Sequence, residues 1–194
     1  MQKIMFNDRY GLTQAVIEGR KTMTRRLINL NSTSDVPVRI FAGYVQIIGR
    51  SGNVCAEKKL PYKVGEVVAV AQSYKTLLEQ EGVPFEKLCV GIGANDIRWY
   101  NKMFVRADLM PHQIRITGIR IERLQDISDA CCLKEGIRYV PEIDKFYFED
   151  VSREEGFYFD NHREAFASLI DKVSGRGTWA SNPWVVVYEF ELVK

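Results

Sequence analysis

The order of apolar and polar residues predicts a short helix near the start of the chain. Between residues 10 and 18, Leu12, Ala15 and Val16 recur with the i, i+3, i+4 spacing of one helical face. Gly19 follows this stripe, and glycine commonly ends helices because it adopts a left-handed backbone without strain. We therefore expect a helix that stops at Gly19.

Three further segments have helical patterns. TLLEQEG predicts a short helix from about Lys75 to Gln80. ISDACCLKEGI has Ser128 as its N-cap and Gly136 as its C-cap. NHREAFASLIDKVSG is amphipathic, and its apolar side chains fall on one face: Phe166, Leu169, Ile170 and Val173.

Strand patterns are more numerous. VPVRIFAGYVQIIG predicts two strands joined at Ala42 and Gly43, and residues 60–71 predict a turn followed by a buried strand. QIRITGIRIERL alternates in polarity and shifts phase at Gly118, which indicates a β-bulge. NPWVVVYEFEL predicts a final strand, whereas residues 82–101 are glycine-rich and predicted to be irregular. Strands outnumber helices and come in runs, so the expected class is α+β with a mostly β core.

The composition fits a single domain over residues 1–194, because 46% of the residues are hydrophobic and can form a core. Residues 139–159 form an insertion between the last two predicted helices and contain seven aromatic residues mixed with acids. These rings could stack on nucleic-acid bases. The alternative is a β-hairpin that packs its own faces, and we favour it because the acids would repel a phosphate backbone.

The net charge excludes a protein that coats nucleic acid without specificity. Lysine and arginine total 27 against 25 acids, a formal charge of +2. A site for an anion must therefore come from local clustering. One such cluster is GRKTMTRR, residues 19–26, which contains four basic residues and two threonines without an acid: Arg20, Lys21, Arg25, Arg26, Thr22 and Thr24.

Two interpretations of this basic turn stand side by side. Its arginines have the planar geometry that binds phosphates or carboxylates in pairs of hydrogen bonds. Burial and neighbouring cations would lower the pKa of Lys21, so that its neutral amine could act as a base toward Thr24 if the turn is helical. The alternative is a solvated turn whose cations favour the C-terminus of the preceding helix.

Several classes of protein are not expected. No segment has the roughly 20 apolar residues that span a bilayer, and MQKIMFNDRYGL lacks the pattern of a signal peptide. The four cysteines form no CxxC pair, and only two histidines accompany them: Cys55, Cys89, Cys131, Cys132, His112 and His162. We therefore expect a cytoplasmic protein with reduced thiols, without a metal or cofactor. For the Cys131–Cys132 pair we expect one buried and one edge thiol.

Several motifs, taken together, resemble the ASCH (activating signal cointegrator homology) family, in particular its longer phage- and prophage-type members. They are GRKTMTRR after a short helix, VGEVVAV, RITGIRIERLQDIS, the EG of LKEGI, and the terminal NPWVVVYEF. The resemblance extends in order from residue 4 to residue 193, with variable insertions expected at about 78–100 and 139–160. The G-[RK]-K-T-x-T-x-R core is specific when a late EG and a C-terminal strand accompany it.

This resemblance implies a PUA-like fold, which is a small β-barrel with flanking helices. It also implies a role in RNA binding, with a cleft lined by the GRKT turn. One small bacterial branch resembles amidohydrolases that remove acyl groups from N4-acylated cytidine. In that branch a lysine, a threonine and a later glutamate act together, and these positions correspond to Lys21, Thr24 and Glu135. An arginine, Arg25 or Arg26, would stabilise the developing negative charge.

The sequence departs from the family at one place. The longer members commonly have a pattern like V-R-E-T-W after VGE, whereas the aligned stretch here is Val70–Tyr74, VAQSY, so that Gln72 replaces an acid. If that acid contacts the ligand, this protein binds its ligand differently. The chain is also about twice the length of the small amidohydrolases, so that its cleft could be covered.

Three residues near the C-terminus have two interpretations. Trp179 and Trp184 could form a cleft wall for a stacked base, but a role as core anchors of the last strand is favoured. Arg176 lies between two glycines and could contact a phosphate or form an exposed loop tip.

We therefore expect a protein that binds RNA or a modified nucleoside in a basic cleft, through Lys21 and a set of polar residues: Arg20, Thr22, Thr24, Arg25, Arg26 and Arg176. The alternative is an amidohydrolase that uses Lys21, Thr24 and Glu135, and it predicts that these three converge on a small pocket. A second alternative is a phage-accessory interaction protein with a vestigial cleft. RNA binding predicts an open basic groove with salt-dependent affinity.

Overall fold

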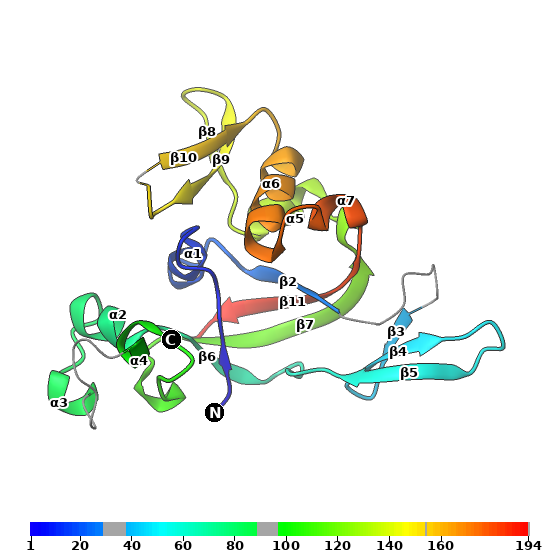
Figure 1. The fold of residues 1–194 in the computed structure, drawn as a ribbon, viewed down its shortest axis with the longest axis horizontal. Helices are drawn as coiled ribbons and strands as arrows, with labels where there is room; N and C mark the ends of the chain where they lie inside the picture. Colours follow the sequence, from blue (N-terminus) through cyan, green and yellow to red (C-terminus); the bar gives the residue numbers. More distant parts are fainter. Residues whose placement is uncertain (29–37, 89–96, 154, 194) are drawn as a thin grey trace.

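The computed structural model describes residues 1–28, 38–88, 97–153 and 155–193. Its centre is a five-stranded sheet with the order β1-β6-β7-β11-β2, in which β1 pairs in parallel with β6 and the other pairs are antiparallel (Figure 1). The strands are β1 (Lys3–Ile4), β6 (Val67–Val70), β7 (Gln113–Arg123), β11 (Trp184–Leu192) and β2 (Met23–Leu27). The fold is therefore α+β, as predicted.

The closed barrel that the family resemblance implied is not seen in the described residues. Their strands form the five-stranded sheet and two separate three-stranded sheets, all of them open. β2 is the last strand of the central sheet, so one of its two edges has no neighbouring strand in this part of the chain.

The long pair β7 and β11 forms the spine of the central sheet. β7 alternates apolar and polar residues, whereas residues 184–188 of β11 are all apolar, and Ile114, Ile116, Val185 and Val187 are completely buried. The predicted bulge is confirmed, because Glu189 pairs with Gly118 whereas Phe190 pairs with Ile116, which leaves Thr117 as the extra residue. The extra residue bends the pair beneath the helices (Figure 1).

The basic segment is extended, so the condition that its turn be helical, which was considered for bringing Thr24 to Lys21, is not met. The first helix, α1 (Leu12–Ile17), is followed by Gly19 with a positive φ of 72°, as expected, but the basic segment then enters β2. Thr24 pairs with Tyr188 of β11, and Arg26 pairs with Val186. Pairing with these distant residues favours the extended backbone. The eight residues of the basic segment give no information about that pairing.

Helices cover one side of the central sheet. They are α5 (Asp129–Lys134), α6 (His162–Ser174) and α7 (Thr178–Ser181), with a 3-10 turn at Leu124–Asp126 before them. The amide oxygen of Asn161 caps α6 by accepting from the Glu164 N–H at 2.8 Å. Phe166, Leu169 and Ile170 of the predicted apolar face of α6 are buried, whereas its fourth residue, Val173, is exposed.

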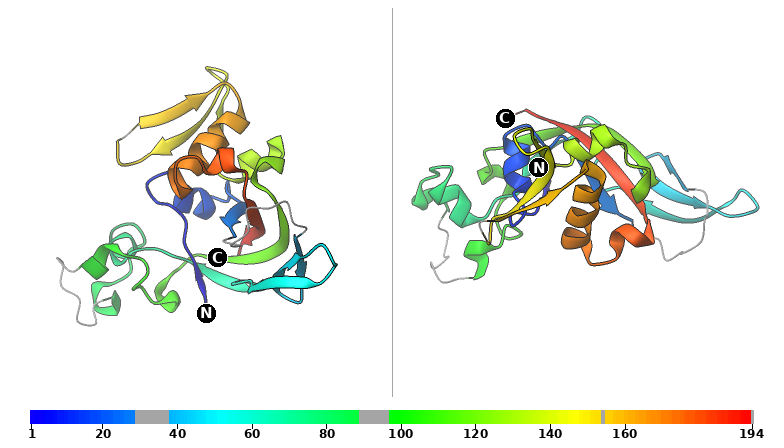
Figure 2. Two further views of the ribbon diagram at one scale, coloured as in Figure 1. Left: turned by 45° about the vertical axis from the view of Figure 1, so that its right-hand side comes forward. Right: turned by 90° about the horizontal axis from the view of Figure 1, so that it is seen from above.

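Two peripheral units lie at opposite ends of the central sheet in both views of Figure 2. One is the sheet of β3 (Val38–Phe41), β4 (Tyr44–Ile48) and β5 (Val54–Lys59), in which the predicted hairpin at Ala42 and Gly43 is confirmed. The other contains α2 (Tyr74–Glu79), α3 (Phe85–Leu88), α4 (Ile97–Tyr100) and a 3-10 turn at Ala107–Leu109.

The short helix predicted at Lys75–Gln80 is confirmed by α2, but the irregular structure predicted for residues 82–101 was wrong for its described parts. Trp99 of α4 stacks on Tyr74 of α2 with ring centroids 6.1 Å apart, and both side chains are buried. A small separate core holds these short helices together, which local patterns do not predict. Residues 89–96 lie outside the described part of the chain.

The aromatic segment after α5 forms a three-stranded sheet of β8 (Arg138–Val140), β9 (Lys145–Asp150) and β10 (Glu155–Phe159). Its rings stack on one another, since Phe148 lies 5.1 Å from Phe157 and 5.8 Å from Phe159 between centroids. The predicted hairpin that packs its own faces is therefore confirmed. An ion pair connects this sheet to the N-terminal segment, because the Arg9 guanidinium donates to the buried carboxylate of Asp150 at 2.8 Å.

None of the helices within the described ranges combines the length and apolar character required to cross a bilayer.

Gly136, the glycine after α5, lets the end of α5 lie close to α1 and Lys21. Gly136 has a φ of +106°, and a Cβ there would lie 3.2 Å from Leu12 of α1 and 3.7 Å from the Lys21 side chain. Gly175 has nearly the same φ, +109°, but no atom lies within 4 Å of its hypothetical Cβ. Alanine at Gly175 would therefore add backbone strain alone, whereas alanine at Gly136 would add both backbone strain and a close contact with Leu12.

We expect Gly175→Ala to lower the free energy of unfolding by about 1–3 kcal/mol through backbone strain. Gly136→Ala should cost about 1–3 kcal/mol more, because Leu12 must also move. Urea denaturation of both variants measures the difference. Equal costs would show that the contact of Gly136 with α1 is unimportant.

Candidate functional site

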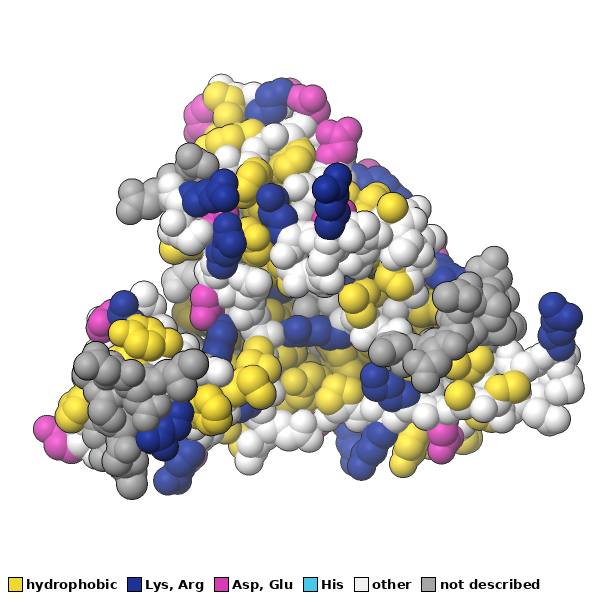
Figure 3. Space-filling view, viewed as in Figure 1, with side chains coloured by type: hydrophobic (Ala, Val, Ile, Leu, Met, Phe, Trp, Pro, Cys, Tyr) yellow, Lys and Arg dark blue, Asp and Glu magenta, His cyan; other side chains and the backbone are white. Residues whose placement is uncertain are grey.

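A pocket of about 270 Å³ lies beside the free edge of β2, between the N-terminal segment and α6. Figure 3 shows a hollow in the middle of this face, with apolar side chains on its floor and basic side chains at its rim. Its lining combines charged and apolar residues: Phe6, Asn7, Leu12, Lys21, Thr24, Arg25, Arg26, Leu27, Glu135, Phe166, Leu169, Ile170, Val173 and Ser174. Five of these were predicted from the sequence as site residues: Lys21, Thr24, Arg25, Arg26 and Glu135.

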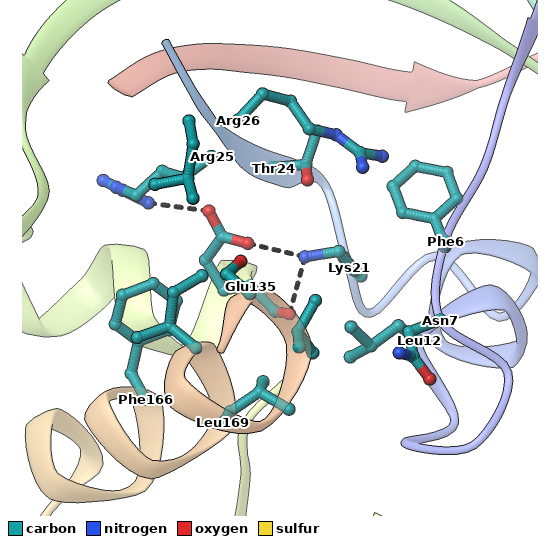
Figure 4. A pocket seen from close by; sticks show the side chains of 14 residues that line it. Phe6, Asn7, Leu12, Lys21, Thr24, Arg25, Arg26, Glu135, Phe166 and Leu169 are labelled. Atoms are coloured by element: carbon teal, nitrogen blue, oxygen red, sulfur yellow. Dashed lines mark hydrogen bonds and ion pairs between the residues drawn. The ribbon is translucent and has the colours of Figure 1, made fainter. Parts of the chain in front are cut away.

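A buried ion pair forms one wall of the pocket (Figure 4). Lys21 Nζ donates to the Glu135 carboxylate at 2.6 Å and to the Glu135 backbone carbonyl at 2.7 Å. The two residues are 2% and 4% exposed, so little water screens the pair. Lys21 reaches this position because its backbone N–H donates to Ala15 O, and Glu135 because it ends α5.

The second oxygen of Glu135 accepts a hydrogen bond from Arg25 at 2.9 Å. The same guanidinium donates twice to Glu122 of β7, at 2.9 and 2.7 Å. Glu122 also accepts from Arg120 at 2.9 Å, and Arg120 binds Glu189 of β11. A chain of alternating charges therefore runs from the pocket across the sheet.

Burial and neighbouring charges shift two of these groups. Burial lowers the pKa of Lys21, and the cations Arg26 and Arg25 lower it further, whereas Glu135 opposes the shift. For Arg25, burial would lower the pKa, but Glu135 and Glu122 outweigh it and raise the pKa. The lysine is thus the group of the pair that can lose its proton, and Arg25 stays charged.

The hydroxyl of Thr24 has no hydrogen-bond partner among the described residues, and its side chain points from β2 toward the Lys21 amine (Figure 4). Beside it, the Arg26 guanidinium lies over the Phe6 ring, 5.6 Å from the centroid, and donates to the Met5 carbonyl. Burial lowers the pKa of Arg26. A hydroxyl, an amine and a guanidinium thus meet at one surface of the pocket.

The apolar lining was missed as a part of the site. Phe166 and Leu169 of α6 lie opposite Lys21 and Glu135 in Figure 4, and Phe6 closes the other side. The sequence assigned the apolar face of α6 to the core, which is correct for most of its surface. Val173, at the end of the same apolar face, is 37% exposed and lines the pocket. An apolar stripe that continues beyond the buried core is the feature of the sequence that could have indicated a pocket.

Three predicted ligand contacts lie outside this pocket. Arg20 pairs with Glu18 at 2.6 Å, the Thr22 N–H donates to Lys134 O, and Arg176 is exposed in the turn after α6. None of the three lines the pocket.

The two tryptophans also lie outside this pocket. Trp179 packs edge-on against Phe166, and Trp184 lies beneath Arg123. Both side chains are half-buried, so neither belongs to the buried core that was favoured from the sequence. As predicted, one thiol of the α5 pair, Cys132, is buried and Cys131 is half-buried.

Gln72, which stands where longer ASCH members have an acid, is buried away from the pocket. Its amide nitrogen donates to Glu81 at 2.5 Å, and Glu81 in turn binds His112. No group of three or more histidine, cysteine or acidic side chains within the described ranges could hold a metal ion.

No family model, curated protein or solved structure matches the chain. The function is therefore inferred from the geometry of the pocket.

The charge arrangement predicts unequal costs for removing the two partners of the ion pair. Glu135→Leu leaves two buried cations without their carboxylate, and we expect it to lower the free energy of unfolding by about 3–5 kcal/mol. Lys21→Met leaves Glu135 paired with Arg25 and should cost about 1–3 kcal/mol. Urea denaturation at neutral pH measures both. A smaller cost for Glu135→Leu than for Lys21→Met would contradict this account of the network.

Proposed function

We propose that this protein binds a modified pyrimidine nucleoside in the pocket and hydrolyses an N-acyl amide on its base, as in N4-acylated cytidine. The observation that carries the proposal is the meeting of the buried Lys21–Glu135 pair and the unpaired Thr24 hydroxyl at one pocket. Amide hydrolysis requires a nucleophile, a base for its proton and an acid for the leaving amine, and these three groups supply them.

The ion pair can prepare both the base and the acid. Transfer of one proton across the 2.6 Å bond from Lys21 to Glu135 produces a neutral amine and a carboxylic acid. The amine takes the proton of Thr24, whose oxygen attacks the amide carbonyl carbon. Glu135 gives its proton to the amide nitrogen as the C–N bond breaks. The products are an acyl ester on Thr24, the free base amine and the restored ammonium–carboxylate pair.

The second half repeats these proton transfers with water. After another transfer to Glu135, neutral Lys21 takes a proton from water, and the hydroxide formed attacks the ester. Glu135 protonates Thr24 Oγ as the C–O bond breaks, which releases the carboxylic acid. One amide and one water are consumed in the full cycle. Arg26 lies beside Thr24 and would stabilise the negative oxygen of each tetrahedral intermediate.

The distribution of charge favours a neutral substrate over a phosphate. Of the four cations in the basic segment, three already bind carboxylates: Arg20, Lys21 and Arg25. The remaining one, Arg26, donates to the Met5 carbonyl and has no carboxylate partner among the described residues. A pocket of about 270 Å³ with one available guanidinium and aromatic walls suits a flat, uncharged base.

The test is release of free cytidine from N4-acetylcytidine by the purified protein. We expect turnover by the wild type and a loss of about 10²–10⁴-fold in kcat/KM for Lys21→Met, Thr24→Val and Glu135→Gln. Arg20→Ala is the matched control, because it removes a cation of the same segment outside the pocket, and its activity should be unchanged. Absence of turnover by well-folded wild type would refute this substrate.

The pH profile provides a second readout of the same mechanism. The reactive pair shares a single proton between Lys21 and Glu135, and loss of that proton leaves no acid for the leaving amine. We therefore expect kcat/KM to fall as pH rises through the lowered pKa of Lys21, which lies below the ordinary lysine value of 10.5. Arg26 contributes to lowering that pKa, so Arg26→Gln should move the fall to higher pH. A fall that stays in place would show that another group titrates.

A second candidate function, binding of single-stranded RNA, is favoured by a different observation. A smaller pocket of about 140 Å³ shares Arg26 and Leu27 with the first and is flanked by Lys58 and Lys59 of β5. β5 is exposed along its whole length, and its two lysines have no acidic partner among the described residues. A chain passing over them could place one nucleotide in the larger pocket.

The double variant Lys58→Ala/Lys59→Ala tests this function. If both lysines contact phosphates, the slope of log affinity against log salt should become shallower by roughly 1.4. Arg115→Ala is the control, since Arg115 lies on β7 and pairs with Glu191 at 3.1 Å. Fluorescence anisotropy with a short labelled RNA measures the slopes. Equal slopes for wild type and the lysine variant would exclude this path.

A further inference from the structure

The free edge of β2 presents main-chain groups to the pocket. In an antiparallel pair, successive residues of a strand direct their N–H and C=O groups alternately toward the partner and away from it. Phe190 N–H donates to Thr22 O at 2.9 Å, and Ile28 N–H donates to Trp184 O at 3.2 Å. Even-numbered residues of this strand therefore face β11. The N–H and C=O groups of Arg25 and Leu27 point the other way.

Those outward groups lie where a ligand can reach them. Arg25 and Leu27 both line the larger pocket, and no described residue pairs with β2 on this side. Just before the strand, the Thr22 N–H donates to Lys134 O, so that α5 lies against the start of β2. The open part is thus shorter than an ordinary strand of five or six residues. It suits a single flat ring better than an extended peptide.

We propose that Arg25 C=O and Leu27 N–H together bind the edge of the substrate's base, so that the pocket selects heterocycles with adjacent hydrogen-bond donor and acceptor atoms. This inference rests on the proposed binding of a nucleoside. The carbonyl of one residue and the N–H of the second residue after it form a neighbouring acceptor and donor on a strand edge. Unpaired edge groups of this kind readily bind a complementary partner.

Cytosine has the matching pattern. Its N4 amine donates and its N3 ring nitrogen accepts, and an N4-monoacylated base keeps one N–H. Binding of N4–H to Arg25 C=O would bring the scissile amide to the same wall as Thr24 and Glu135, since all three residues line one pocket. The main chain thereby positions the base, whereas the side chains of Lys21, Thr24 and Glu135 act on the acyl group.

A single proline substitution in β2 tests whether the Leu27 N–H binds the base, because proline has no backbone N–H. Leu27→Pro removes an N–H that points away from β11, and an edge strand tolerates proline in that orientation. Leu27→Ala controls for the lost side chain. Equilibrium binding of cytidine to wild type and both variants, measured by calorimetry, should show about tenfold weaker binding for Leu27→Pro and a much smaller change for Leu27→Ala.

A ligand-side comparison remains decisive if Leu27→Pro does not fold. 3-Methylcytidine cannot accept at N3, and N4,N4-dimethylcytidine cannot donate at N4. Both should bind wild type at least about tenfold more weakly than cytidine. Equal binding of the three nucleosides, or an unchanged Kd for folded Leu27→Pro, would overturn the edge assignment while nucleoside binding stands. Failure of wild type to bind any of them would overturn both proposals.

Discussion

The carboxylate of Glu135 organises the site, because two cations from one short segment converge on it. Lys21 binds one of its oxygens at 2.6 Å and Arg25 the other at 2.9 Å, and all three side chains are nearly excluded from water. A buried carboxylate costs several kcal/mol of desolvation unless its oxygens are paired. Its position therefore determines where the start of β2 and the end of α5 lie. The pocket exists between these elements and α6.

The glycine after Glu135 and the edge position of β2 follow from the same requirement. Gly136 lets α5 stop against α1 and Lys21 without a side chain in between, which keeps the carboxylate within reach of the amine. β2 has one edge without a neighbouring strand in the described part of the chain, and the pocket lies along it. The carboxylate is thus held at a place where the main chain, as well as side chains, is open to a ligand.

Local patterns predicted most elements, because their causes are local. Capping residues and apolar stripes located α1, α5 and α6, and a shift in alternation located the bulge at Gly118. The extended backbone of the basic segment was not predicted, since it depends on pairing with a strand more than 150 residues later. The lysine–glutamate pair likewise joins residues 114 positions apart. Only the family resemblance placed Glu135 beside Lys21, and it gave no indication of Glu122, which fixes Arg25 from β7.

The long-range pairing also explains why a nearly neutral protein concentrates cations on one segment. The sequence shows four basic residues without an intervening acid, and this pattern favours a surface that attracts anions. In the fold, acids from three other segments reach these cations: Glu18, Glu122 and Glu135. Most of the charge is therefore neutralised internally and holds the elements together. What remains for a ligand is Arg26, an amine of lowered pKa and a free hydroxyl, a set that suits chemistry on an amide better than capture of a phosphate chain.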